Sequence, residues 1–204
     1  MNIDIFEKWD NSTLTYDLKR YNFPALVLEL VQELYPDVPS LEQIHRFVPA
    51  EQIATMCVHV QKSFGKKKFM TLFDSFAEEY LAPKIGSQKY LIKRQATLNC
   101  VIPNQVKSAR RLLFHQGIWV SNGRGMTTQW MPLTKAFATN SMYIASHKDS
   151  ITLTKKVIRE KLNLEQFENE CLKISKPVEK QPGEVHLFHQ EHIHGNVNNE
   201  TDIT

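Results

Sequence analysis

The spacing of apolar residues along this chain changes near Gly86. Before that point, apolar residues recur at the intervals of amphipathic helices, as in "FPALVLELVQELY" and "KKKFMTLFDSFAEEYL". After it, the short apolar runs "LLFHQGIWV", "TTQWMPLT", "SMYIAS" and "GEVHLFH" are separated by Gly, Asn and Ser, a pattern typical of strands and turns. One helical stretch, "SITLTKKVIREKLNLEQFENECLK", interrupts them. We therefore predict an α+β chain with a helical N-terminal region at residues 1–88 and a β domain at residues 89–204.

The β domain is expected to be an antiparallel barrel or jelly roll. Its predicted strands are short, and they do not alternate regularly with helices as they would in a parallel sheet. A chain of 204 residues is long enough to bury one core with a helical region packed beside it.

Composition argues against several classes of partner. The chain has 25 basic and 22 acidic residues, a balance too even to indicate nucleic-acid binding, and its one basic cluster, residues 66–68, is interpreted as a solvated helix start. We expect no signal peptide, and no run approaches the roughly 20 apolar residues of a membrane span. Cys57, Cys100 and Cys171 form no CxxC pair, which favours free thiols and a cytoplasmic location.

Histidines near the end of the chain suggest a metal site. His186, His189, His192 and His194 lie within nine residues, and His115 ends an earlier apolar run. Two histidines from separate strands that met at one end of a barrel would supply two metal ligands, and imidazole suits Fe, Zn, Cu and Ni. An alternative is a cupin-like isomerase, or a zinc site made by the last three histidines, although no cysteine accompanies them.

Five motifs carry a resemblance to a known family. In order they are "TLNCVIP", "FHQGIWVSN", "QWMPLT", "TNSMYIASHK" and "GEVHLFHQEHIHGNVNNETDIT", covering residues from about 94 to the end. Together they resemble the phytanoyl-CoA-hydroxylase-like branch of the Fe(II)/2-oxoglutarate-dependent oxygenases, and within it the small members of carbohydrate and aminoglycoside biosynthesis clusters. The resemblance implies a double-stranded β-helix, a jelly roll of the cupin type, with Fe(II) and 2-oxoglutarate as cofactor and co-substrate.

The resemblance also assigns roles to individual residues. It places the two iron ligands at His115 and at His194 of "HGN", so the three histidines before His194 are not ligands in that family. Trp130 matches a tryptophan that packs near the co-substrate, although it could equally be a core aromatic. Asn196 is a candidate for contacting the co-substrate, and His147 matches a turn that is structural in relatives.

Gly117 is the first departure from the family pattern. Relatives have an Asp or Glu ligand two residues after the first histidine, whereas this chain reads His-Gln-Gly. Gln116 cannot easily replace it, because its side chain in a strand faces away from that of His115. The same substitution distinguishes iron halogenases, where chloride enters the vacated position. Gly117 therefore has three possible interpretations. The protein is a halogenase, or it is a hydroxylase whose iron takes water or another side chain, such as Asn122 or Glu191, as the third ligand. In the third interpretation the site has no iron chemistry.

The second departure concerns the clamp for 2-oxoglutarate. Relatives use an arginine ten or eleven residues after the second histidine, because its planar guanidinium binds a carboxylate at two points. Thr204 is ten residues after His194, so the expected arginine would come next, and the strand that carries it is also missing. We expect a barrel that lacks its last strand, in a fragment or a decayed relative, with an unpaired sheet edge. Arg110 and Arg111 are alternative cations, for which a role at the surface or in binding a substrate phosphate is favoured.

These observations lead to one expected function with alternatives. The expected function is that of a non-haem Fe(II)/2-oxoglutarate-dependent dioxygenase, an oxidoreductase acting on a carbohydrate, nucleotide-sugar or similar small polar metabolite. The alternatives are a halogenase, with halide as a further partner, and an impaired barrel that serves as a binding or relic protein. O2 is the other expected reactant, and neither nucleic acid nor membrane is an expected partner.

Overall fold

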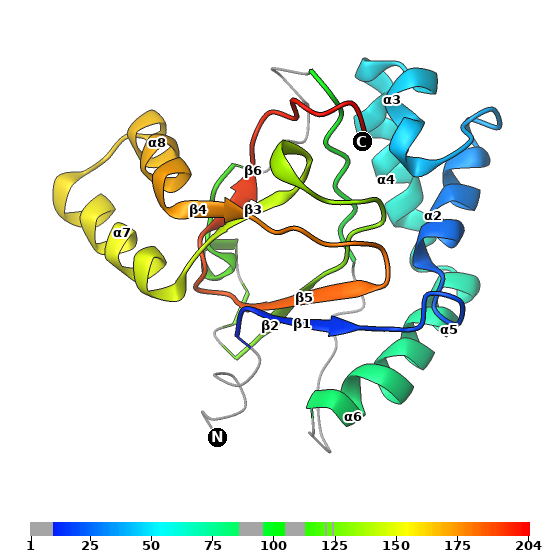
Figure 1. The fold of residues 1–204 in the computed structure, drawn as a ribbon, viewed down its shortest axis with the longest axis horizontal. Helices are drawn as coiled ribbons and strands as arrows, with labels where there is room; N and C mark the ends of the chain where they lie inside the picture. The colour runs from blue at the N-terminus through cyan, green and yellow to red at the C-terminus, as the bar shows by residue number, and fades with distance from the viewer. Residues whose placement is uncertain (1–9, 86–95, 105–112, 121, 124) are drawn as a thin grey trace.

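The computed structural model describes residues 10–85, 96–104, 113–120, 122–123 and 125–204. The described part combines helices with two small antiparallel sheets, which confirms the mixed helix-and-sheet class predicted from the sequence. Helices α2–α6 gather on one side of the sheets, and the α7–α8 pair projects on the other (Figure 1).

The elements have the following bounds. The strands are β1 (Ser12–Thr15), β2 (Thr127–Trp130), β3 (Met142–Ala145), β4 (Ser175–Pro177), β5 (Glu184–His189) and β6 (His194–Asn196). The α-helices are α2 (Phe23–Gln32), α3 (Ile44–Phe47), α4 (Ile53–Ser63), α5 (Lys67–Ser75), α6 (Ala82–Ile85), α7 (His147–Glu160) and α8 (Leu164–Ile174). A π-helical turn lies at Phe76–Leu81, and 3-10 turns lie at Leu41–Gln43, Ala50–Gln52, Gly117–Val120 and Ala138–Asn140.

Local side-chain chemistry fixes where the longer helices begin. Asn22 before α2 and Ser146 before α7 each accept a hydrogen bond from a backbone N–H in the first helical turn. Asn163 and Gln166 form a reciprocal capping box at the start of α8. These side chains satisfy backbone N–H groups that have no partner inside the helix.

Strand β5 lies at the centre of the first sheet, between β1 and β2, and both pairings are antiparallel. Because successive residues of a strand face opposite sides, its two faces enter different cores. Val185 and Leu187 pack with the apolar side chains of α2, α4 and α5. His186 and Phe188 face the other way, and Phe188 packs on residues of the second sheet. The strand is therefore buried on both faces.

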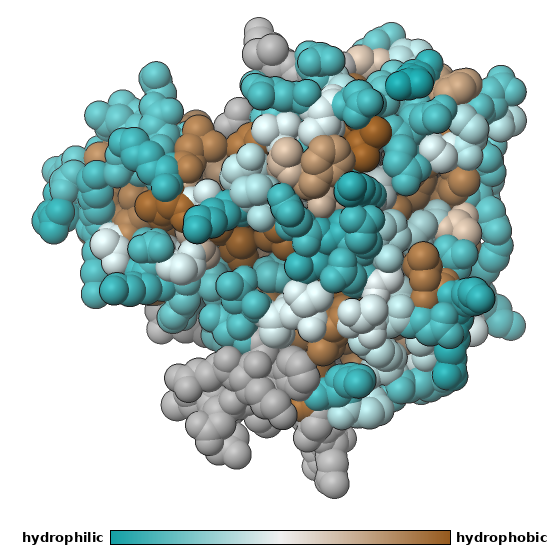
Figure 2. All heavy atoms as spheres, in the orientation of Figure 1, coloured by the Kyte–Doolittle hydropathy of each residue, from teal (hydrophilic) through white to brown (hydrophobic). Residues whose placement is uncertain are grey.

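Strand β3 lies at the centre of the second sheet, between β4 and β6. On its outer face, Ala145 packs with Leu153 of α7 and Phe167 of α8. On its inner face, Met142 packs with Phe188 of the first sheet. Apolar surface is visible where the α7–α8 pair joins the rest of the molecule, within a mainly hydrophilic face (Figure 2).

The strand pairs are nested along the chain. His115 pairs with His194, β2 with β5, and β3 with β4, so residues 115–145 and 175–194 form the two arms of an antiparallel ribbon. Helices α7 and α8 lie at the tip of this ribbon. Strand β6 also pairs with β3, which means that the ribbon is rolled onto itself.

Several details differ from the expectation. Strand β1 lies inside the region predicted to be helical, because its four residues are too few to show a period and its pairing with β5 forms the strand. The run around His115 makes one β-bridge and then a 3-10 turn rather than a strand. The described strands form no closed barrel, so the jelly roll stays a prediction. The predicted boundary at residues 88 and 89, and Arg110 and Arg111, lie outside the described residues.

The helices of the described ranges are all too short or too polar to cross a membrane.

An aromatic cluster joins the helices to the first sheet. Phe76 is fully buried, and its ring centroid lies 5.1 Å from that of Tyr16, the residue after β1. Tyr21 and Phe23 lie at 5.2 Å and 5.4 Å from the same ring. All three contacts are edge-to-face, an arrangement that the aromatic quadrupoles favour. Phe76 therefore holds the end of β1 against the helices.

We expect Phe76→Ala to lower the free energy of unfolding by about 3–5 kcal/mol, because it removes buried area and leaves a cavity among the rings. Phe47→Ala is the matched control: Phe47 is 42% exposed, and its replacement is expected to cost less than about 1 kcal/mol. Urea unfolding measures both variants. Equal losses would contradict a central role for Phe76.

Candidate metal site

His115 and His194 lie side by side on adjacent segments. The backbone N–H of each donates to the carbonyl oxygen of the other, both at 2.9 Å, which is a single antiparallel bridge. Their ring centroids are 4.4 Å apart, with 49° between the ring planes. The structure thus brings together the two histidines that were predicted as metal ligands.

Backbone carbonyls fix the tautomers of both imidazoles. Nδ1 of His115 lies 2.9 Å from the carbonyl oxygen of Leu113, and Nδ1 of His194 lies 3.0 Å from that of His192. A carbonyl can only accept, so each Nδ1 carries the hydrogen and each Nε2 keeps its lone pair in the neutral ring. Metal-binding histidines are commonly oriented by such a contact to a backbone carbonyl.

The neutral form of His194 is favoured. Burial lowers the pKa of His194 to about 4, and the neighbouring His115 adds to the effect. The ring of Phe188 lies 4.8 Å from that of His194, on the inner side of the sheets. A neutral imidazole can donate a lone pair to a metal at pH 7, whereas an imidazolium cannot.

A complete set of common ligand types is not present around this pair. Within the described residues, no group of three or more His, Cys, Asp or Glu side chains could hold a metal ion. This finding does not support the alternative zinc site made by His189, His192 and His194. Of the side chains considered as a replacement ligand, Asn122 donates to Gln190 and Glu191 lies 3.3 Å from Nε2 of His147.

Gly117 is buried, and the space next to it is filled. A Cβ atom at residue 117 would lie 1.8 Å from Oε1 of Gln190, so the glycine is what leaves room for this carboxamide. Sequence reasoning missed Gln190, which comes 73 residues later and carries no motif of its own. The vacated position, in which a halide was considered, is thus occupied by a side chain.

Trp130 and Asn196 lie on the inner side of the sheets, whereas His147 is exposed on the outer side. Trp130 of β2 lies opposite His186 of β5 and packs partly on the inner core. Asn196 is buried, and its Nδ2 donates to the carbonyl oxygen of Ser141 at 3.3 Å. His147 is the first residue of α7, next to the turn that the motif predicted.

Two features hold the segment of His115 in place from outside. The backbone N–H of Phe114 donates to the buried carboxylate of Glu168 in α8, at 2.9 Å. Gly195 allows the close approach from the other side, because a Cβ there would lie 2.8 Å from Cα and 2.9 Å from N of Phe114. Both contacts act on the residue directly before His115.

His192, two residues before His194, is hydrogen-bonded to Asp10. Nε2 of His192 lies 2.7 Å from Oδ1 of Asp10, and its Nδ1 lies 2.8 Å from the carbonyl oxygen of Ala145. Burial opposes the charged form of His192, but these hydrogen bonds outweigh it and raise the pKa. Burial also opposes the charge of Asp10, and the bond from His192 outweighs it, so the pKa of Asp10 is lowered.

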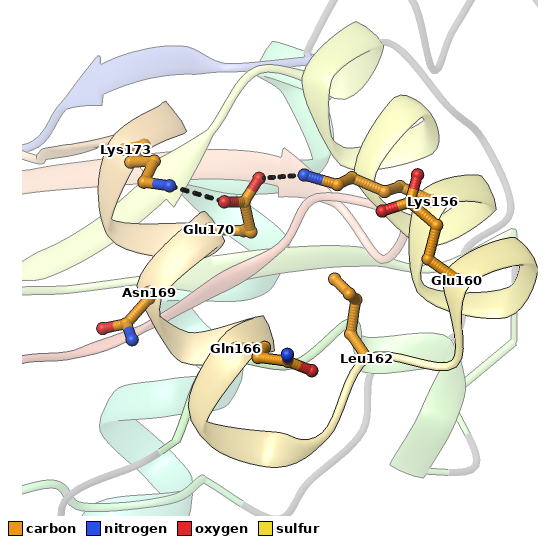
Figure 3. Close-up of a pocket in the computed structure, with 7 residues that line it drawn as sticks. All are labelled: Lys156, Glu160, Leu162, Gln166, Asn169, Glu170 and Lys173. Carbon is orange, nitrogen blue, oxygen red and sulfur yellow. Dashed lines mark hydrogen bonds and ion pairs between the residues drawn. The ribbon is translucent and has the colours of Figure 1, made fainter.

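An open groove between α7 and α8 is another possible binding site (Figure 3). Glu170 lies in it and accepts hydrogen bonds from Lys156 and Lys173, both at 2.6 Å. These two bonds lower the pKa of Glu170 to about 2. No histidine lines the groove, and its two lysines, Lys156 and Lys173, are balanced by Glu160 and Glu170, so it is a weaker candidate than the histidine pair.

Comparison of this chain with protein-family models, curated proteins and solved structures gives no match.

We expect Gly195→Ala to destabilise the protein by about 1–3 kcal/mol, because the new methyl group meets backbone atoms of Phe114 that cannot rotate away. Gly123→Ala is the control, since a Cβ at that position meets nothing within 4 Å. Thermal unfolding compares the two. A Gly195→Ala variant as stable as the control would show that the two segments are not this close.

Asp10→Ala is expected to destabilise the protein in a pH-dependent way. The raised pKa of His192 contributes stability below about pH 6.5 that is lost as the pH rises through its folded value, and the lowered pKa of Asp10 contributes stability above about pH 3.8. The loss on substitution should therefore be about 1.5–3 kcal/mol at pH 5 and smaller at pH 9. Urea unfolding at both pH values tests this, and an equal loss at both would refute the charged pair.

Proposed function

We propose that this chain is a non-haem Fe(II)/2-oxoglutarate-dependent oxygenase whose iron is held by His115 and His194. The observation that carries the proposal is the geometry of these two residues. Two imidazoles lie with ring centroids 4.4 Å apart, and each has Nδ1 engaged by a backbone carbonyl, which leaves both Nε2 lone pairs for a metal. Imidazole ligands suit Fe(II), and vacant positions on that metal suit oxygen chemistry.

The strand pairing supports a jelly-roll fold for the proposed oxygenase. A jelly roll is an antiparallel ribbon that is rolled so that its strands form two facing sheets. The nested pairs of residues 115–145 with 175–194, and the extra pairing of β6 with β3, are part of such a roll. His115 and His194 lie at one end of the ribbon, where the family pattern expects the iron.

The space between the two sheets is where we propose that 2-oxoglutarate binds. His186 faces this space, and neither of its ring nitrogens has a hydrogen-bond partner among the described residues. Burial lowers the pKa of His186 to about 4, so the ring is neutral and keeps one N–H to donate. A buried polar group without a partner is what a bound carboxylate would satisfy. Trp130 lies opposite His186 and would contact the bound co-substrate.

Bound Fe(II) and 2-oxoglutarate would supply the activation of O2 for oxidation of the substrate. The residues of this chain orient the site: the carbonyls of Leu113 and His192 aim the two imidazoles, and Phe188 shields His194 from water on the inner side. The proposed substrate is a small polar metabolite such as a carbohydrate or nucleotide-sugar, and this class rests on the resemblance alone. The three buried cysteines form no disulfide, which suits the proposed cytoplasmic location.

The surroundings of Gly117 and the types of side chain near it bear on the two alternative functions, a halogenase and a protein that binds metal without turnover. A halogenase needs room for chloride beside the iron, and Oε1 of Gln190 fills the space next to Gly117, which favours the oxygenase. A protein that binds metal without turnover is favoured by the missing acidic ligand among the described residues. Consumption of 2-oxoglutarate under O2 separates this second candidate from the oxygenase.

We expect the chain to bind one Fe(II) or Co(II) per molecule, and His115→Ala and His194→Ala to weaken binding by at least about tenfold each, because each removes one of two imidazole ligands. His59→Ala is the control, since His59 lies on α4 among the helices. Anaerobic titration measures affinity, and the visible Fe(II)–2-oxoglutarate charge-transfer band reports the co-substrate. Unchanged affinity in both site variants would place the metal elsewhere.

A further inference from the structure

The carboxamide of Gln190 occupies the position that a side chain at residue 117 would have. A Cβ at Gly117 would lie 1.8 Å from Oε1 and 2.9 Å from Cδ of Gln190. Gln190 is only 2% exposed, so this group is buried. Gly117 follows His115 by two residues and begins the 3-10 turn Gly117–Val120, so the carboxamide lies beside the segment that carries the His115 imidazole. Gln116, between them, donates from its Nε2 to the carbonyl oxygen of Glu191 at 2.5 Å.

Hydrogen bonds fix the orientation of this carboxamide. Nε2 of Gln190 donates to the hydroxyl of Thr128 at 2.5 Å, and its Oε1 accepts from Nδ2 of Asn122 at 3.0 Å. An amide oxygen has two lone pairs, so Oε1 can accept a further interaction while it keeps the bond to Asn122. The group is therefore preorganised with its oxygen toward Gly117.

The backbone ties Gln190 to both histidine-bearing segments. The N–H of Ile118 donates to the carbonyl oxygen of Gln190 at 3.3 Å, three residues after His115. In the other direction, the chain reaches His194 four residues after Gln190. A change in the position of either segment would thus move the carboxamide with it.

We infer that Gln190 supplies Oε1 as a third, neutral oxygen ligand to the metal held by His115 and His194, in place of the carboxylate that Gly117 cannot provide. This inference rests on the proposed metal site. A carboxamide oxygen is a hard donor that suits Fe(II), Mn(II) and other divalent cations. Glycine at residue 117 is then required, because any larger side chain would compete with Gln190 for the same space.

The first test is Gln190→Glu, which keeps the size of the side chain and gives its oxygen a negative charge. The Thr128 hydroxyl can donate to the new carboxylate, so the local packing is preserved. We expect Co(II) and Fe(II) to bind about tenfold more tightly or better, because ligand charge raises affinity for hard cations, and the visible spectrum of bound Co(II) to change. Gln190→Ala is expected to weaken binding about tenfold.

Gln129→Glu is the matched control for the added charge. Gln129 lies on β2 next to Thr128, but adjacent strand residues face opposite sides, so its side chain does not face Gln190. The control is expected to leave the Co(II) affinity and spectrum unchanged. Circular dichroism and thermal unfolding of every variant confirm that it is folded before affinities are compared.

A double variant provides a second test that does not depend on Gln190→Glu. Gly117→Asp combined with Gln190→Ala removes the carboxamide and offers a carboxylate in its place, and Gly117 has no positive φ that would exclude aspartate. We expect this double variant to recover the metal affinity that Gln190→Ala loses. Recovery would show that the two positions serve the same coordination site.

The outcomes separate this inference from the proposed function. Loss of binding in His115→Ala and His194→Ala, with wild-type affinity and spectrum in both Gln190 variants, would overturn the role of Gln190 and leave the histidine site intact. Wild-type affinity in the histidine variants would overturn both. Loss in the histidine variants, a gain in Gln190→Glu and recovery in the double variant are the results expected from a third ligand.

Discussion

The reciprocal backbone hydrogen bonds between His115 and His194 are the constraint on which the candidate site depends. In an antiparallel pair of this kind the two Cα atoms lie about 5.5 Å apart, so the side chains start as close neighbours. The described part of the segment at residues 113–116 has no longer strand pairing to support it. Its position is held instead by Glu168 on the backbone of Phe114 and by the absence of a side chain at Gly195. The geometry of the candidate site thus depends on contacts made by residues that are not among its proposed ligands.

Hydrogen-bond partners, rather than burial alone, give His192 and His194 opposite charge preferences. The two residues flank Ile193, and burial favours the neutral form of both. Both ring nitrogens of His192 face acceptors, the carbonyl of Ala145 and the carboxylate of Asp10, which requires two hydrogens and favours the cation. His194 has one acceptor and another imidazole beside it, so its neutral form is favoured. One short segment therefore carries both a histidine whose contacts favour the charged form and a candidate ligand.

Periodicity in the sequence predicted the helical N-terminal region and the later short strands, because both patterns come from side chains that face one core. It did not predict β1, which exists through its pairing with β5, or the break between α7 and α8, where Lys161 adopts a left-handed conformation. His115 and His194 were paired only through a family resemblance. Asp10 and Gln190 were missed, because their roles depend on contacts with residues 182 and 68 positions away. Such contacts follow from the rolled ribbon and leave no local pattern.

The charges of the proposed site explain why a neutral third ligand suits it. The inner space contains Phe188, Met142 and Val178, so it is largely apolar, and an unbalanced charge there would be costly. Fe(II) carries two positive charges, and 2-oxoglutarate carries two negative charges at pH 7. With two neutral imidazole ligands and the carboxamide of Gln190, the proposed assembly would be electroneutral. An aspartate at residue 117 would add a net negative charge to the same space, and His186, which is neutral at pH 7, could not offset it. The pairing of Gly117 with Gln190 would thus fill the proposed metal shell without burying a further charge.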